Sequence, residues 1–261
     1  MKYSIITIEY FQEVYDMAFT VKLAGKTFRI EHVHPELELF CRDYLIEDCT
    51  PDFEILISEK DIFYEENFAT EQTFSAPYLE TLALLRKISD IFPKHNRFLM
   101  HGASISYDDD AFLFTAPSGT GKSTHIRLWK KYIGEKVKIV NGDKPFISLD
   151  ENPSGNIEPM IYGTPWAGKE RWQRNCSEPL KGICFVQRGT TNTIHQMQPE
   201  ECVMMLFNQV YMPEDSAAAG LTLELLDTLV KNVPFYLLTC DMSEDAVRCS
   251  FEALTGLSYP N

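Results

Sequence analysis

Residues 116–124 constrain the fold more than any other segment of the chain. They read Ala-Pro-Ser-Gly-Thr-Gly-Lys-Ser-Thr, and an apolar run, residues 112–115, comes directly before them. The two glycines allow backbone conformations that turn successive N–H groups toward one point, and a helix that begins at the lysine adds its own unpaired N–H groups. We therefore expect a strand, an anion-binding loop and a helix in that order, within an α/β fold.

The residue types of this loop suit the phosphates of a nucleotide. Lys122 is placed to reach the β- and γ-phosphates, and the hydroxyl of Ser123 is placed to ligate Mg²⁺. Ala116 stands where the pattern usually has its first glycine, and the alternative interpretation is a surface turn rich in glycine and serine. The flanking strand and helix patterns favour the phosphate loop. The expected nucleotide-binding residues are Ser118, Gly119, Thr120, Gly121, Lys122, Ser123 and Thr124.

Two further residues are candidates for the chemistry. Asp143 follows the apolar residues 137–140, at the end of the strand expected after the loop helix. A carboxylate there can bind Mg²⁺ or take a proton from an attacking hydroxyl, whereas the alternative is an ordinary Asn-Gly-Asp turn. His101 ends the apolar residues 98–100, and a lone histidine in such a place is more often structural. Pairing of its strand with residues 111–115 would bring it near the loop.

The rest of the chain shows ordinary helix and strand patterns. Apolar spacing predicts helices over residues 35–46, 77–92, 122–133, 200–208, 216–230 and 243–254. A hairpin is expected around Ala24-Gly25-Lys26, and residues 98–105 are expected to form one strand that pairs with residues 111–115. Residues 151–179 are expected to be rich in loops because prolines recur there.

Charge and composition exclude several classes of protein. The net charge of −14 argues against broad binding to nucleic acid or to an anionic membrane. The seven cysteines are odd in number and lack C-x-x-C spacing, so neither a disulfide framework nor a zinc site is indicated. Residues Met1 to Phe11 lack the pattern of a signal peptide, and we expect a cytoplasmic protein. His32 and His34 lack a third ligand and are interpreted as solvated.

Three segments together resemble a known superfamily. They are Met100-His-Gly-Ala-Ser-Ile105, Phe112-Leu-Phe-Thr-Ala-Pro-Ser-Gly-Thr-Gly-Lys-Ser-Thr124 and Ile139-Val-Asn-Gly-Asp143. Their order and spacing are similar to those of the HPr kinase and ATP-dependent phosphoenolpyruvate carboxykinase superfamily. The resemblance implies a P-loop core over residues 95–261 with a mixed, largely antiparallel sheet. Residues 1–94 would then form a smaller α+β region, with acceptor recognition as its expected role by elimination.

The resemblance also implies roles for single residues. His101, Lys122, Ser123 and Asp143 would be active-site residues, with Ser123 and Asp143 as ligands of Mg²⁺ and ATP as the nucleotide. Two positions depart from the superfamily. Lys144 breaks an acidic pair, and Thr124 stands where HPr kinase has glutamate.

The segment Tyr162-Gly-Thr-Pro-Trp166, with Gly168, resembles small HPr-kinase-like proteins of peptide-modification clusters, some of which phosphorylate a serine of a precursor peptide. Residues 162–174 are rich in cations and tryptophan for such an acidic chain. Arg171, Arg174 or Lys169 can meet the charge of a transferring phosphoryl group, and Glu170 can replace the acid that is missing at residue 144. Trp166 is expected to pack on a base or a peptide, and the loop to act as a lid. The alternative is a solvated surface loop.

Three functions stay open from the sequence. The first is an ATP-dependent kinase that phosphorylates a hydroxyl, most simply a serine, of a peptide or small protein. The second is a non-catalytic nucleotide sensor or degenerate kinase, which the lysine at residue 144 favours. The third is a carboxykinase-like enzyme, which the short chain of 261 residues disfavours.

Overall fold

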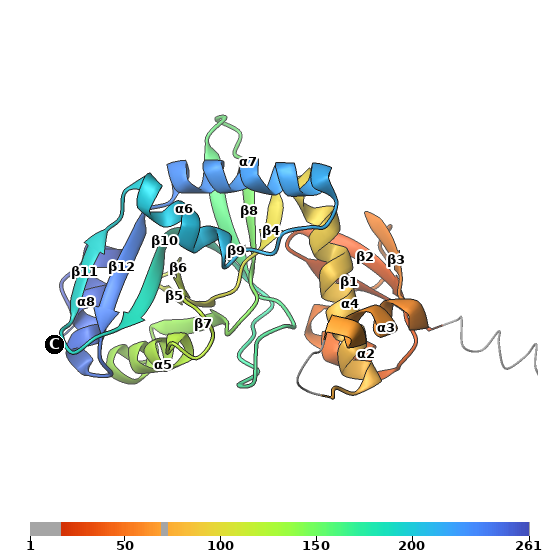
Figure 1. The fold of residues 1–261 in the computed structure, drawn as a ribbon, viewed down its shortest axis with the longest axis horizontal. Helices are drawn as coiled ribbons and strands as arrows, with labels where there is room; N and C mark the ends of the chain where they lie inside the picture. Colours follow the sequence, from red (N-terminus) through yellow and green to blue (C-terminus); the bar gives the residue numbers. More distant parts are fainter. Residues whose placement is uncertain (1–16, 69–72, 261) are drawn as a thin grey trace, which may run out of the picture. The chain divides into compact units, whose positions relative to one another are not determined.

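The computed structural model describes residues 17–68 and 73–260 (Figure 1). Residues Met1 to Phe11, where a signal peptide was not expected, lie outside these ranges. The chain forms two compact units, Met1–Ile91 and Phe92–Asn261. The second unit begins with the 3-10 helix η2 (Phe92–His95), which contains the boundary expected between residues 94 and 95. Among the described residues, no helix has the length and apolar composition needed to cross a bilayer.

The first unit combines a small sheet with three α-helices in its described part. Its strands are β1 (Ala18–Leu23), β2 (Lys26–Glu31) and β3 (Phe53–Leu56), in the order β1-β2-β3. The predicted hairpin between β1 and β2 is confirmed, and its turn places Ala24 and Gly25 in the left-handed region at φ 47° and 77°. The helices are α2 (Glu36–Cys41), α3 (Glu59–Phe68) and α4 (Ala76–Ile91), and the 3-10 helix η1 (Arg42–Tyr44) follows α2.

A buried carboxylate joins α4 to the segment after β2. Glu80 is fully buried and accepts hydrogen bonds from the backbone N–H groups of Val33 and His34, at 2.6 and 3.0 Å. His34 Nδ1 lies 2.9 Å from the same carboxylate, and buried His32 places its Nδ1 2.9 Å from the carbonyl of His34. The expectation that both histidines are solvated is therefore wrong, because His32 is part of the packing of this unit.

The second unit is built on a mixed sheet that contains the candidate loop. The strand order is β4-β8-β9-β10-β6-β5-β7, with β12 beside β10 and β11 beside β12. The parallel pairs of this sheet are β10 with β6 and β10 with β12, and its other pairs among the described residues are antiparallel. The bounds are β4 (Arg97–Leu99), β5 (Ala103–Tyr107), β6 (Asp110–Thr115), β7 (Val137–Asn141), β8 (Phe146–Glu151), β9 (Ile157–Tyr162), β10 (Ser177–Arg188), β11 (Thr193–Gln196) and β12 (Phe235–Cys240).

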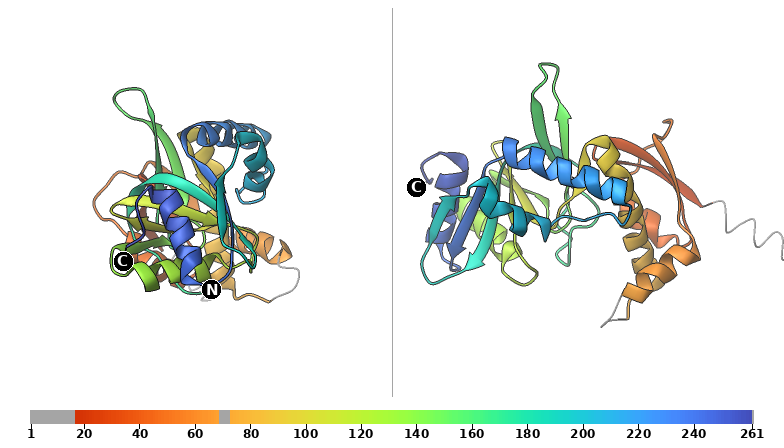
Figure 2. Two further views of the ribbon diagram at one scale, coloured as in Figure 1. Left: turned by 90° about the vertical axis from the view of Figure 1, so that its left-hand side faces the viewer. Right: turned by 45° about the horizontal axis from the view of Figure 1, so that its top comes forward.

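Helices cover both faces of this sheet (Figures 1 and 2). The helices are α5 (Lys122–Ile133), α6 (Pro199–Phe207), α7 (Ser216–Asn232) and α8 (Glu244–Thr255). Alternate residues of β6 point to opposite faces, as the period of a strand requires. Leu113 packs in a cluster with residues of α6 and α7, and Phe114 packs in another with Trp129 of α5 and Phe251 of α8. The phosphate-type loop therefore follows a strand whose two faces pack against two separate hydrophobic clusters.

Five of the six predicted helices are confirmed as α4 to α8, with ends that differ by at most two residues. The helix predicted over residues 35–46 is shorter, since α2 ends at Cys41 and η1 follows it. One strand expectation is wrong. Residues 98–105 do not form one strand, because β4 pairs with β8 while only β5 pairs with β6. The stretch 151–179 is rich in loops and has no helix, as predicted, and it also contains the short strand β9. Pro159 of β9 is paired only with β8, and a strand tolerates proline where no neighbouring strand needs its N–H group.

Buried His125 of α5 makes the stability of the second unit depend on pH. Trp129 Nε1 donates to His125 Nε2 at 3.2 Å, and within the described residues His125 Nδ1 has no hydrogen-bond partner. Burial lowers the pKa of His125 from 6.5 to about 4. The unfolded chain therefore binds more protons than the folded chain between these two values, so stability is complete above pH 6.5 and falls as the pH falls toward 4.

We predict that the free energy of unfolding is about 2 kcal/mol lower at pH 5 than at pH 8 because of this one group. In the variant His125→Gln, whose amide oxygen can still accept from Trp129, that part of the pH dependence disappears. Urea titrations followed by tryptophan fluorescence measure it, since all three tryptophans lie in the second unit. The exposed His195→Gln is the control and keeps the wild-type slope. Equal slopes in His125→Gln and wild type would contradict the prediction.

Candidate functional site

The loop between β6 and α5 has the backbone of an anion-binding turn. Gly119 and Gly121 have φ values of 77° and 126°, which disfavour residues that carry a Cβ atom. Helix α5 begins at Lys122, so its unpaired N–H groups face the loop. Lys122 Nζ donates to the carbonyl of Ala116 at 2.8 Å across the loop. Burial lowers the pKa of Lys122, whereas the charge of Asp143 acts to raise it.

Arg188, which was not predicted as a site residue, donates hydrogen bonds to two carbonyl groups of this loop. Arg188, the last residue of β10, donates from Nη2 to the carbonyl of Gly119 at 2.6 Å and from Nε to that of Thr120 at 3.0 Å. A guanidinium satisfies both acceptors at once because its donors lie in one plane. Its sequence signal is weak, because it is only a cation at the end of an apolar strand in an acidic chain.

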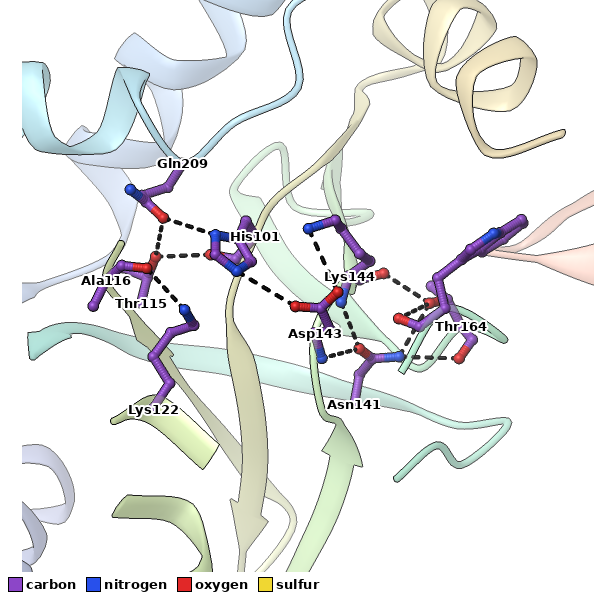
Figure 3. Close-up of polar contacts among 10 residues, drawn as sticks. His101, Thr115, Ala116, Lys122, Asn141, Asp143, Lys144, Thr164 and Gln209 are labelled. Carbon is purple, nitrogen blue, oxygen red and sulfur yellow. Dashed lines mark hydrogen bonds and ion pairs between the residues drawn. The ribbon is translucent and has the colours of Figure 1, made fainter. Parts of the chain in front are cut away.

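His101 and Asp143 face each other beside the loop (Figure 3). His101 lies in the break between β4 and β5, and Asp143 follows β7. His101 Nε2 is 3.4 Å from Asp143 Oδ1, and Lys144 Nζ is 3.5 Å from Asp143 Oδ2. The carbonyl of Asp143 also accepts from the N–H of Gly102 at 2.9 Å, which joins the two segments. The break in the predicted strand is thus what exposes the His101 ring to Asp143.

The charge state of Asp143 follows from these neighbours. Burial raises the pKa of its carboxyl, but the hydrogen bond from His101 and the positive charges of Lys144 and His101 outweigh it, and the net pKa is lower than usual. Asp143 is therefore ionised at neutral pH. An ionised carboxylate can accept a hydrogen bond from a hydroxyl or ligate a metal ion.

Asn141 fixes the backbone that carries Asp143. It is fully buried, and its Oδ1 accepts from the N–H groups of Asp143 and Lys144, both at 2.8 Å. Its Nδ2 donates to the carbonyl and hydroxyl oxygens of Thr164, both at 3.0 Å. Thr164 in turn donates its hydroxyl to the carbonyl of Lys144 at 2.7 Å. The Asn-Gly-Asp segment is more than a turn, because it ties the loop after β9 to the Asp143 backbone.

Glycines allow this loop to lie against β7. A Cβ atom on Gly163 would lie 1.7 Å from the carbonyl oxygen of Arg174, and one on Gly142 would lie 2.5 Å from that of Ala167. Arg174 N also donates to the carbonyl of Val140 at 3.1 Å. Residues 163–174 therefore pack on the end of β7.

The expected functional residues of this loop have different surroundings. Glu170 Oε1 is 3.7 Å from Arg127, and a Cβ atom on Gly168 would lie 3.9 Å from Glu170 Oε2 and 3.2 Å from Asp143 Cβ. Glu170 and Asp143 thus lie beside the same glycine. Arg171 is exposed and has a positive φ of 53°.

Two side chains of this loop serve the packing in this structure. Arg174 pairs with Glu178 at 2.9 Å instead of standing as an unpaired cation. Trp166 is buried and lies edge-on to Phe146, so its ring does not stand out for a base or a peptide as expected. Glu170 is thus the member of this loop that lies beside Asp143, whereas the side chain of Arg171 is exposed.

The donor atoms near the loop suit Mg²⁺ better than a metal held by protein ligands alone. Within residues 17–68 and 73–260, no group of three or more His, Cys, Asp or Glu side chains is arranged to hold a metal ion. Mg²⁺ commonly takes one or two protein oxygens and completes its shell with phosphates and water. The hydroxyl of Ser123 and the carboxylate of Asp143 are ligands of that kind.

Comparison with known proteins adds a distant structural likeness. No protein-family model matches the chain, and no curated protein matches it. Among solved structures, the chain is similar to the HPr(Ser) kinase/phosphatase from Coxiella burnetii, with 12% identity and a TM-score of 0.33 over 60% of this chain and 93% of that chain. At this identity and TM-score we infer nothing about activity from the likeness, and the function proposed below is supported by the site residues.

We predict that Asn141→Ala destabilises the second unit by about 3 kcal/mol, because it leaves buried N–H groups of Asp143 and Lys144 without acceptors. Urea unfolding followed by tryptophan fluorescence measures the change. Asn156→Ala, in the exposed β8–β9 turn, is the matched control and shifts the free energy by less than about 0.5 kcal/mol. A similar small shift in both variants would show that the Asn141 network contributes little.

Proposed function

We propose that the protein is an ATP-dependent kinase that transfers the γ-phosphate to a hydroxyl, most simply that of a serine, of a peptide or small protein. The observation that supports this best is the convergence of three groups: the phosphate-type loop, Lys122 and the ionised Asp143. The negative charge of Asp143 acts to raise the pKa of Lys122, so the two charges interact. A cation for the phosphates and an anion for the acceptor are the two charges that phosphoryl transfer requires of a site.

The chain's own residues account for binding and orientation. Loop N–H groups from Ser118 to Thr124 would surround the β- and γ-phosphates, and Lys122 would exchange its bond to the Ala116 carbonyl for a phosphate oxygen. Mg²⁺, held through Ser123 and Asp143, would neutralise charge that develops on the phosphates. Asp143 would orient the acceptor hydroxyl and accept its proton as the new P–O bond forms and the bond to ADP breaks.

Other residues near Asp143 complete the proposed site. His101 would stay beside the phosphates through its contact with Asp143. Glu170 would act as the second acid and Arg171 would meet the charge of the moving phosphoryl group. The first unit is proposed to recognise the acceptor, and the cytoplasm is the proposed location.

A second function, a non-catalytic nucleotide sensor, is favoured by one observation. Lys144 occupies the place of a second acid and lies 3.5 Å from Asp143, where its charge competes with a metal ion for that carboxylate. Such a protein binds ATP through the loop and transfers nothing. The third candidate, a carboxykinase-like reaction, is tested directly by an assay with oxaloacetate and ATP.

We predict that purified protein, with ATP, Mg²⁺ and the peptide encoded next to its gene, adds about 80 Da to that peptide. In Asp143→Asn the rate of transfer falls by about three orders of magnitude or more, because the acceptor loses its base, while ATP binding changes only a few-fold. Mass spectrometry of the peptide measures the transfer, and calorimetric titration with ATP measures the binding.

Asp109→Asn is the matched control, since Asp109 lies in the exposed turn between β5 and β6 and leaves transfer unchanged. A wild-type protein that binds ATP and modifies no plausible acceptor would contradict the kinase. A functional response to ATP that is retained in Asp143→Asn would support the nucleotide sensor.

We predict that Arg188 also contributes to the binding of ATP. Arg188→Gln is expected to weaken the affinity for ATP about tenfold, because the carbonyls of Gly119 and Thr120 lose a charged donor that fixes the path of the loop. Arg188→Lys retains one charged donor group, and its affinity for ATP is expected to lie between those of wild type and Arg188→Gln. Calorimetric titration measures the affinity, with Lys181→Gln on the same strand as the control. Unchanged affinity in Arg188→Gln would assign Arg188 no part in binding.

A further inference from the structure

Arg127 of α5 contacts two residues of the loop between β9 and β10. Its Nη2 lies 3.7 Å from Glu170 Oε1, and its guanidinium carbon lies 5.3 Å from the centroid of the Trp172 ring. A guanidinium at such a distance is attracted by the face of an aromatic ring, and it can direct its N–H groups at a carboxylate at the same time. One side chain of α5 therefore holds this loop on both sides of Arg171.

The position of Arg127 on α5 relates these contacts to the phosphate-type loop. Arg127 comes four residues after Ser123, and residues at this spacing lie on one face of a helix. Another face carries Ile126 and Trp129, which are buried in a hydrophobic cluster. The face that carries the proposed Mg²⁺ ligand Ser123 thus continues to the loop that carries Glu170.

A tight turn fixes the backbone that carries Glu170. Arg171 N donates to the carbonyl of Gly168 at 3.2 Å, and these two residues have positive φ values of 53° and 76°. Glu170 Oε1 pairs with Arg127, while Oε2 would lie 3.9 Å from a Cβ atom on Gly168, which in turn would lie 3.2 Å from Asp143 Cβ. The carboxylate of Glu170 thus has one neighbour in the guanidinium and another in the glycine that packs on Asp143.

The charge of Arg127 is suited to this place. Asp143 is ionised at neutral pH, and it repels a second carboxylate beside the same glycine. A guanidinium next to Glu170 offsets part of that repulsion. The Arg127 side chain is 61% exposed, and exposed ion pairs contribute little to the stability of a fold. The pair is therefore better suited to orienting a side chain than to stabilising the unit.

We propose that Arg127 is a positioning residue that holds Glu170 beside Asp143, so that the loop between β9 and β10 supplies the acid missing at residue 144. The inference rests on the proposed kinase function for its effect on the rate. Arg127 acts through Glu170 and does not itself contact the phosphates or the acceptor. Its replacement therefore lowers turnover without weakening the binding of ATP, which depends on the phosphate-type loop.

Limited proteolysis of the full chain measures how firmly this loop is held. Trypsin cleaves after Arg171, which is exposed and lies between the two residues that Arg127 contacts. In Arg127→Met, which removes the charge and keeps a long side chain, we expect this cleavage to be about three- to fivefold faster, because both contacts are lost. Arg127→Lys keeps a cation for the carboxylate and the ring, and its rate is expected to lie close to that of wild type. Mass spectrometry of the fragments identifies the bond that is cleaved.

Lys130→Met is the matched control. Lys130 lies on the same helix and pairs with Glu135 at 3.0 Å, so this variant also removes a surface ion pair of α5. It is expected to leave cleavage after Arg171 and turnover at their wild-type values. The midpoint of urea unfolding is expected to be the same in wild type and in both methionine variants.

Kinetics supply the second measurement. In Arg127→Met we expect kcat to fall about tenfold, with the KM for ATP within about twofold of wild type, and Arg127→Lys to recover most of the loss. In the Glu170→Gln background, Arg127→Met is expected to cause no added loss of kcat, because its effect passes through the carboxylate.

Three results would overturn the proposal: an unchanged rate of cleavage after Arg171 in Arg127→Met, a lower midpoint of urea unfolding in that variant, or an equal loss of kcat with and without the Glu170 carboxylate. The cleavage rates do not depend on turnover. If wild type transfers no phosphate, the kinase function fails, while cleavage after Arg171 still decides whether Arg127 holds the loop.

Discussion

The buried amide of Asn141 is the interaction on which the candidate site depends. All of its hydrogen-bonding capacity is used within two short segments, the end of β7 and the loop after β9. A buried polar side chain of this kind is stabilising only while every partner is present, because each unpaired group in the interior costs free energy. The position of Asp143, the packing of Gly142 against Ala167 and the path of residues 163–174 are therefore coupled to one side chain. The site is rigid where the acid is held, although the acid itself is partly exposed.

The charges around the site run against those of the whole chain. The chain has a net charge of −14, yet Lys122, Lys144 and Arg188 all lie near the loop or the acid that follows it. An acidic surface repels a nucleotide at long range, but salt screens that repulsion beyond about 8 Å. At shorter range, the local cations and backbone N–H groups determine whether the nucleotide binds. Lys144 lowers the pKa of Asp143, and its ammonium group would also compete with a bound metal ion for the same carboxylate.

Local patterns in the sequence were sufficient for helices α4 to α8 and for the phosphate-type loop, whereas α3 was not predicted. Apolar spacing predicted α4 to α8 closely, and the motif correctly indicated a strand before the loop and a helix after it. The break at His101 was not predictable in this way, because β4 leaves the hairpin to pair with β8, almost fifty residues away. Asn141 and Arg188 were missed for the same reason: their partners are 23 and 68 residues distant in the chain. A side chain's type gives no sign of a partner that only the fold supplies.

Strand β10 contains an irregularity whose effect reaches the loop. Its register with β6 shifts between Leu180 and Gly182, so that Lys181 is an extra residue relative to the neighbouring strand. Leu180 and Ile183 consequently face the same core, although regular alternation would place them on opposite faces. Every residue after the bulge inherits the changed phase, including Arg188 at the end of the strand. Loss of Lys181 itself would leave Leu180 and Gly182 as neighbours opposite Ala111 and Phe112, so the guanidinium would keep its face. Loss of one residue between the bulge and Arg188 would instead turn the guanidinium to the other face of the sheet and away from the phosphate-type loop.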